Sequence, residues 1–189
     1  MSPFPPAANP KNYGFSYHFF VSYTTREDEV RIIKPFVDDY GKALGQRLGF
    51  PPIYYDGWYI KKSKYHHPEE LRSTLSKAIR ESAFTVSFLS PHYLRSEWCR
   101  FEWQETERVH SVRPNPAPEK SILPITWKRI KYSESPNLCE RHQTWRYHSP
   151  VDVSAELYGH NYGPKYGTAL IECVNATVAF INAWFPAEL

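Results

Sequence analysis

The chain has 189 residues, of which 41% are hydrophobic, and a formal net charge of +3. This length is enough for one domain, which buries roughly 70% of the surface that its unfolded chain exposes. The modest charge, with lysine and arginine spread along the chain, argues against direct binding of nucleic acid. Three widely spaced cysteines argue against a disulfide framework. Since we find no apolar leader and no membrane-spanning run, we expect a cytoplasmic protein without membrane contact.

The first third of the chain predicts a strand followed by a long helix. Residues 1–14 are rich in proline and are expected to form a disordered lead-in. The aromatic and β-branched run 17–23 is typical of a buried strand. Apolar residues recur every three or four positions over 30–48, which predicts an amphipathic helix. Its Pro35 would be tolerated in the first turn if the helix begins near Lys34.

The middle of the chain predicts two further strands, each followed by a helix. Residues 53–56 are interpreted as the second strand, and a long polar loop, 57–67, follows it. Pro68 and the acids after it predict a helix start. The apolar run 84–89 predicts the third strand, and the next helix carries Glu102 close to its amino end.

The last third is less regular. Residues 121–127 predict a fourth strand, in which Pro124 indicates an edge position or a bulge. Residues 128–166 show no sustained period, so only a short strand or a helical turn is expected there. Apolar residues over 167–185 recur as on a helix that faces a core.

This order predicts an α/β fold with a doubly wound parallel sheet in a single domain over residues 15–189. Parallel strands end at one edge of their sheet, and such edges hold the sites of open α/β proteins. The strands are expected to end at Tyr23, Asp56, Leu89 and Trp127. The residues that follow these ends are therefore the candidates for a site.

Three stretches, in this order along the chain, resemble the sequence boxes of one family. They are Phe20-Val21-Ser22-Tyr23 leading into a helix, a strand that ends in Asp56, and Ser96 to Glu102 with the pattern S-x-W-C-x-x-E. Together they resemble Toll/interleukin-1 receptor (TIR) domains over residues 17–127 and, by position, the last helix. The resemblance implies a three-layer, flavodoxin-like TIR domain with a mostly parallel sheet of four to five strands flanked by helices.

The resemblance also implies an activity. Many TIR domains cleave the bond between nicotinamide and ribose in NAD, and the essential glutamate of their helix box falls on Glu102. We therefore expect an NAD+ glycohydrolase or ADP-ribosyl cyclase, whose linear or cyclic product serves immune or anti-phage defence. NAD+ is then a substrate, so neither a cofactor nor a metal is expected. The other expected partners are further copies of the chain, through TIR–TIR contacts, and a separate effector or activating protein.

Two alternative functions stay open because a fold does not fix a function. A TIR assembly module without catalysis would recruit partners through the loop 57–67. An enzyme similar to nucleoside deoxyribosyltransferases would act on nucleosides that lack the pyrophosphate.

One carboxylate is sufficient for the expected cleavage. Glycoside hydrolases usually need two because their leaving group must be protonated, whereas nicotinamide departs from NAD as a neutral molecule without a proton. Glu102 would stabilise the developing oxocarbenium ion, and Trp98, one helical turn earlier, is expected on the same face. The alternative interpretation of Glu102 is a solvated acid paired with Arg108 or Arg95.

The expected substrate-binding residues follow strand ends or accompany the helix box. They are Ser22, Tyr23, Thr24, Arg26, Asp56, Trp58, Tyr59 and Trp98. Near Thr24 and Arg26, the pyrophosphate would rest on backbone amides at the helix start, and the alternative there is ordinary capping. Trp58 and Tyr59 are the candidates for covering the adenine.

Overall fold

The computed structural model describes residues 9–56, 67–113, 121–128, 130, 151–152 and 164–185. One sheet holds five strands in the order β2-β1-β3-β4-β5, and every adjacent pair is parallel. The strands are β1 (Tyr17–Ser22), β2 (Tyr54–Asp56), β3 (Ser82–Leu89), β4 (Ile122–Thr126) and β5 (Val151–Asp152). The predicted α/β fold with a parallel sheet of four to five strands is confirmed.

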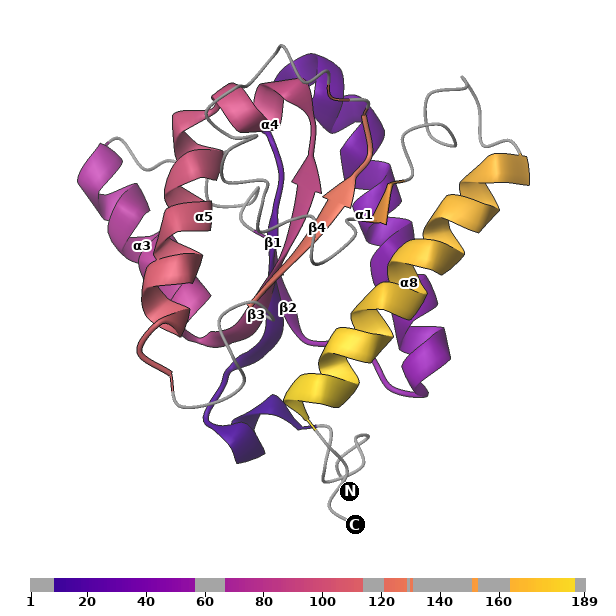
Figure 1. Cartoon of the computed structure of the whole chain (residues 1–189), viewed down its shortest axis with the longest axis horizontal. Helices are drawn as coiled ribbons and strands as arrows, with labels where there is room; N and C mark the ends of the chain where they lie inside the picture. The colour runs from indigo at the N-terminus through magenta and orange to yellow at the C-terminus, as the bar shows by residue number, and fades with distance from the viewer. Residues whose placement is uncertain are drawn as a thin grey trace.

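Helices cover both faces of the sheet, which gives three layers (Figure 1). Helices α1 (Glu27–Leu48) and α8 (Pro164–Trp184) pack together on one face. Helices α3 (Pro68–Arg80) and α5 (Glu97–His110) pack together on the other. The short helix α4 (Pro91–Arg95) connects the carboxyl end of β3 to α5.

The central strand β1 is buried on both of its faces, and its side chains alternate between the two helical layers. Phe19 and Val21 belong to the larger core cluster, which also contains residues of α1 and α8. Phe20 belongs to a second cluster with residues of α3 and α5. Ser22 therefore faces α5, whereas Tyr23, which also belongs to the larger cluster, faces α1.

Regular structure begins closer to the amino terminus than the sequence predicted. Residues Pro10–Tyr13 form a 3-10 turn, η2, and the Asn9 side chain accepts a hydrogen bond from the Lys11 amide at 3.1 Å. The Tyr13 ring lies edge-on to Phe185 after α8, with 5.1 Å between the ring centroids. The expected disordered lead-in over 1–14 is therefore wrong for residues 9–14, because this aromatic contact fixes them to the core.

Helix α1 begins at Glu27, so the condition for placing Pro35 in a first turn, a start near Lys34, is not met. Three acids, Glu27, Asp28 and Glu29, occupy its first turn and stabilise the amino end of the helix dipole. Pro35 consequently lies inside the helix, where it cannot donate a hydrogen bond to the preceding turn.

Strand β4 lies between β3 and β5, so Pro124 does not mark an edge strand. Its register with β3 is continuous from Ile122 to Thr126, which also argues against a bulge. The pairing of β4 with β5 begins only at Ile125, one residue after the proline. The prediction was wrong because the partner strand lies in the segment 128–166, whose sequence showed no clear period.

Gly41 of α1 lies against Tyr54 of β2, and we expect Gly41→Ala to destabilise the protein by about 1–3 kcal/mol. An added Cβ would lie 2.6 Å from the Tyr54 hydroxyl oxygen, and the Tyr54 ring is stacked on Phe19 at 5.2 Å. Gly167→Ala in α8 is the control, because nothing lies within 4 Å of its added Cβ. There the better helix propensity of alanine should stabilise by up to about 1 kcal/mol. Urea unfolding of both variants measures the difference, and a gain at both positions would contradict the packing argument.

Candidate functional site

The candidate site is centred on a buried carboxylate at the carboxyl edge of the sheet. Glu102 is fully buried on the inner face of α5. Its Oε2 atom accepts a hydrogen bond from the Ser22 hydroxyl at 2.5 Å. Ser22 is the last residue of β1, and the alternation along that strand turns its side chain toward α5. The strand end and the helix thus hold one carboxylate in a fixed orientation.

Tyr93 of α4 completes the polar group around Ser22. Its hydroxyl lies 3.0 Å from the Ser22 hydroxyl and donates a hydrogen bond to Ser87 at 3.2 Å. Burial raises the pKa of Tyr93 well above its usual value, and the neighbouring Cys99 and Glu102 add to this effect. The phenol therefore stays protonated and neutral beside the carboxylate.

The solvated alternative for Glu102 is wrong. Arg108, its expected partner, donates two hydrogen bonds of 2.7 Å each to Glu105. The guanidinium of Arg95 lies at the ring of His92. Glu102 instead lies in a region shielded from water, where electrostatic interactions are stronger than at the surface.

Trp98 packs toward α3. Its ring meets Phe101 edge-on at 6.4 Å, and the guanidinium carbon of Arg72 lies 5.9 Å from its centroid. The indole is thus part of the cluster between α3 and α5. A contact between Trp98 and the substrate stays a prediction.

The structure separates two other candidates, Tyr23 and Asp56, from Glu102. The Tyr23 hydroxyl donates to Asp56 at 3.0 Å, and the Lys34 ammonium lies 3.7 Å from the same carboxylate oxygen. This group lies on the α1 side of the sheet, whereas Ser22 and Glu102 lie on the α5 side. The carboxyl edge therefore carries two distinct polar groups.

The remaining candidates lie at the start of α1 or outside the described part of the chain. Thr24 is buried, and its hydroxyl accepts a hydrogen bond from the amide of Arg26, the residue before α1, at 3.3 Å. Arg26 is exposed, and its guanidinium pairs with Asp28 at 2.7 Å. Trp58 and Tyr59 lie outside the described residues.

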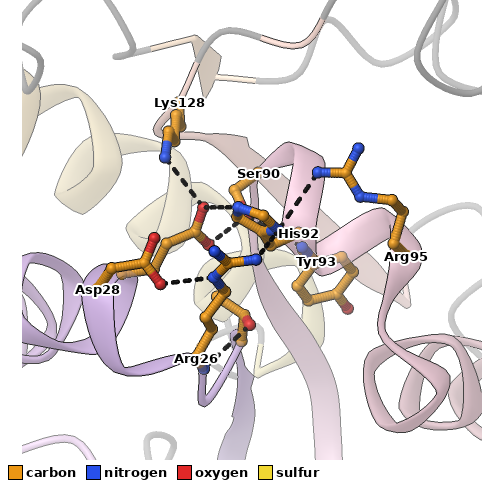
Figure 2. A network of polar contacts seen from close by, with 9 residues as sticks. Arg26, Asp28, Ser90, His92, Tyr93, Arg95 and Lys128 are labelled. Carbon is orange, nitrogen blue, oxygen red and sulfur yellow. Dashed lines mark hydrogen bonds and ion pairs between the residues drawn. The ribbon is translucent and has the colours of Figure 1, made fainter.

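A second buried carboxylate, Glu29, was missed by the sequence analysis. Its Oε2 atom accepts a hydrogen bond from Ser90 at 2.6 Å, and its Oε1 atom lies 3.2 Å from the Lys128 ammonium. Ser90 and Lys128, both labelled in Figure 2, follow the ends of β3 and β4. An acid in a first helical turn usually stabilises the helix dipole, and this is how the sequence alone would explain Glu29. Its contact with Lys128, 99 residues away, becomes visible only in the structure.

The two buried carboxylates are connected through α4. The Ser90 hydroxyl that donates to Glu29 also accepts a hydrogen bond from the Tyr93 amide at 3.0 Å. The Tyr93 hydroxyl in turn reaches Ser22, which holds Glu102. Glu29 therefore helps to fix α4 against the site, and the position of α4 determines that of the tyrosine.

A parallel sheet in the strand order β2-β1-β3-β4-β5, covered by helices on both faces, is the arrangement of a flavodoxin-like α/β domain. The family model for the TIR domain matches residues 19–157, and the chain therefore belongs to the TIR domain family. The predicted membership is thus confirmed.

Solved structures also resemble the chain, among them the following one. The TIR domains of the activated Roq1 resistosome directly recognizing the pathogen effector XopQ are 22% identical to this chain. The match covers 87% of this chain and 98% of that one, with a TM-score of 0.48. No curated protein matches the chain in sequence. Among the described helices, none is long and apolar enough to span a bilayer.

Proposed function

We propose that this TIR domain cleaves the bond between nicotinamide and ribose in NAD+. One observation carries the proposal: the Glu102 carboxylate is fully buried and is held by the Ser22 hydroxyl at 2.5 Å. Preorganised charges in a site shielded from water stabilise transition states more effectively than solvent does. Membership of the TIR family supports the same activity, and we extend the proposal to a cytoplasmic role in immunity.

The chemistry suits a single carboxylate. The glycosidic bond breaks with its electron pair on the nicotinamide nitrogen, so the positively charged ring leaves as a neutral molecule. Positive charge then develops on the ribose, where Glu102 would stabilise it. Attack by water would give ADP-ribose and a proton, and attack by an adenine nitrogen would give a cyclic product. Neutral Tyr93 would add no charge that competes with the carboxylate.

The site must open before it can bind a dinucleotide, because Glu102 has no exposed surface in this conformation. Self-association of TIR domains or an activating partner would supply this opening in the proposed function. The enzyme is thus expected to be weakly active as an isolated monomer.

Chromatography of NAD+ incubated with the purified chain tests the proposal. We expect nicotinamide to appear together with ADP-ribose or a cyclic isomer, at a rate that rises more than linearly with protein concentration. Nucleosides without a diphosphate form a second arm of the assay. Cleavage of nucleosides alone would favour the deoxyribosyltransferase-like alternative. Intact NAD+ at high protein concentration, with and without an activating partner, would overturn the proposal.

Ser22→Ala should lower kcat by about 10-fold to 100-fold, because a hydrogen bond to a charged group is worth about 1.5–3 kcal/mol. The variant keeps the carboxylate but removes the group that orients it. The change in KM should be small, since the proposed role is exerted in the transition state. Ser111→Ala is the control, because this exposed serine lies at the other end of α5. Equal rates for the two variants would contradict the proposed role of Ser22.

A further inference from the structure

Three basic side chains meet at the surface beside the site. Arg26 precedes α1, whereas His92 and Arg95 lie on α4. The two guanidinium groups approach the same ring nitrogen, His92 Nδ1, at 3.1 Å and 3.3 Å (Figure 2). Both arginines are exposed, so the group is accessible from solvent.

The hydrogen bonds fix the state of the imidazole. A guanidinium group can only donate, so His92 Nδ1 must accept from both arginines and carries no hydrogen. The ring hydrogen is then on Nε2, which lies 3.9 Å from Glu29 Oε1. A single lone pair of the ring thus faces two cationic donors. These donors have more hydrogen-bonding capacity than this acceptor can satisfy.

The charges around the imidazole are not balanced. Asp28 pairs with Arg26 at 2.7 Å, and Glu29 pairs with Lys128 at 3.2 Å. Arg95 has no carboxylate partner in the part of the chain that the structure describes. Two guanidinium groups that approach the same ring nitrogen repel each other, and the repulsion is stronger where water is excluded. An oxyanion with several lone pairs and a negative charge would relieve both the repulsion and the unmet donors.

The position of this group relates it to Glu102. Tyr93 follows His92 directly, and its hydroxyl reaches Ser22, which donates to Glu102. One tyrosine side chain thus connects the basic group to the reacting end of the site. In a dinucleotide, the diphosphate is likewise attached to the reacting ribose by a single methylene group.

We propose that Arg26, His92 and Arg95 form a binding site for the diphosphate of a dinucleotide substrate, an inference that rests on the proposed function. Arg26 and Arg95 clamp the anion, and the His92 imidazole occupies the acceptor position until the anion arrives. The first turn of α1 already carries three acids, so its amides are not part of the clamp.

Calorimetric titration with ADP-ribose tests the site without requiring cleavage. We expect Arg26→Gln and Arg95→Gln each to weaken ADP-ribose binding about ten-fold, the loss expected for one charge-assisted contact. Arg100→Gln is the matched control, because it removes the same charge from an exposed position on α5. Binding by this control should equal that of the wild type. Binding of nicotinamide riboside, which has no diphosphate, should be the same in all four proteins. Thermal unfolding of each variant verifies the fold.

Three results would overturn the inference. They are unchanged ADP-ribose binding in both arginine variants, an equal loss in Arg100→Gln, and an equal loss of nicotinamide riboside binding. Binding of inorganic pyrophosphate without binding of ADP-ribose would also count against a dinucleotide site. The result is separable from the proposed function. Selective loss of ADP-ribose binding in a chain that leaves NAD+ intact would support this site and reject the cleavage.

Discussion

Glu102→Gln is expected to lower the rate of nicotinamide release by about 100-fold to 1,000-fold, the usual cost of removing one preorganised electrostatic group. The amide has nearly the size of the carboxylate, and its oxygen can still accept the Ser22 hydrogen bond. It carries no charge, so it cannot stabilise a developing oxocarbenium ion. Substrate binding should change much less than kcat.

The control for this variant is Glu97→Gln, which neutralises an exposed acid in the first turn of the same helix. Both proteins are assayed by chromatography for nicotinamide and are compared by thermal unfolding. Full activity in Glu102→Gln would show that catalysis takes place elsewhere or that the chain is an assembly module. If Glu102→Gln loses both its activity and its fold, the assay is repeated with Glu102→Ala, and ADP-ribose binding is measured as well.

The free energy of unfolding should fall steeply as the pH is lowered from about 6.5 toward 4, and His110 should supply much of this loss. The His110 ring is buried, and burial together with the nearby Arg113 lowers its pKa from 6.5 to about 3. The unfolded chain therefore binds a proton in this range that the folded protein does not bind. At about 1.4 kcal/mol for each pH unit, the unfolding free energy lost through His110 reaches roughly 4 kcal/mol by pH 3. Above pH 6.5 nothing is lost through this group, because the ring is neutral in both the folded and the unfolded chain.

His110→Phe removes the titrating group but keeps a ring against Trp184, whose centroid lies 5.4 Å from that of His110. We expect the unfolding free energy of this variant to depend less on pH between 6.5 and 4. Carboxylates contribute equally to both proteins, so the difference between the two curves isolates the histidine. His67→Gln, at an exposed position before α3, should follow the wild type. Urea unfolding at several pH values measures these curves, and parallel curves for wild type and His110→Phe would contradict the expectation.

Most of the fold could be predicted from the sequence because its strands and helices have distinct hydrophobic periods. Strand β3 is buried at every position and contains no charged residue, which is typical of a central parallel strand. The failures concern contacts between distant segments. Tyr13 is ordered by Phe185, and the place of Pro124 within the sheet depends on β5. Neither partner can be identified from the local sequence.

The candidate site was predictable only in part. Glu102 follows a strand end and belongs to the third matching box. From these two features its place at the carboxyl edge of the sheet was predicted correctly. Its burial and its bond to Ser22 depend on a contact over 80 residues. The separation of Tyr23 from Ser22 could have been foreseen, because neighbouring residues of a strand face opposite layers. Glu29 could not, because its ligands Ser90 and Lys128 lie 61 and 99 residues away.

The long sequence separations within the site have a consequence for the order of folding. β1 is synthesised first but lies between β2 and β3, so Ser22 must wait for later segments before its neighbours exist. A nascent chain ending after β2 contains the serine but has neither Tyr93 nor Glu102. Contacts between residues far apart in the sequence form slowly, because the entropy cost of closing the loop comes before the contact stabilises the chain. Ser22 therefore gains its hydrogen bond to Glu102 only after α5 has been synthesised and has packed against the sheet.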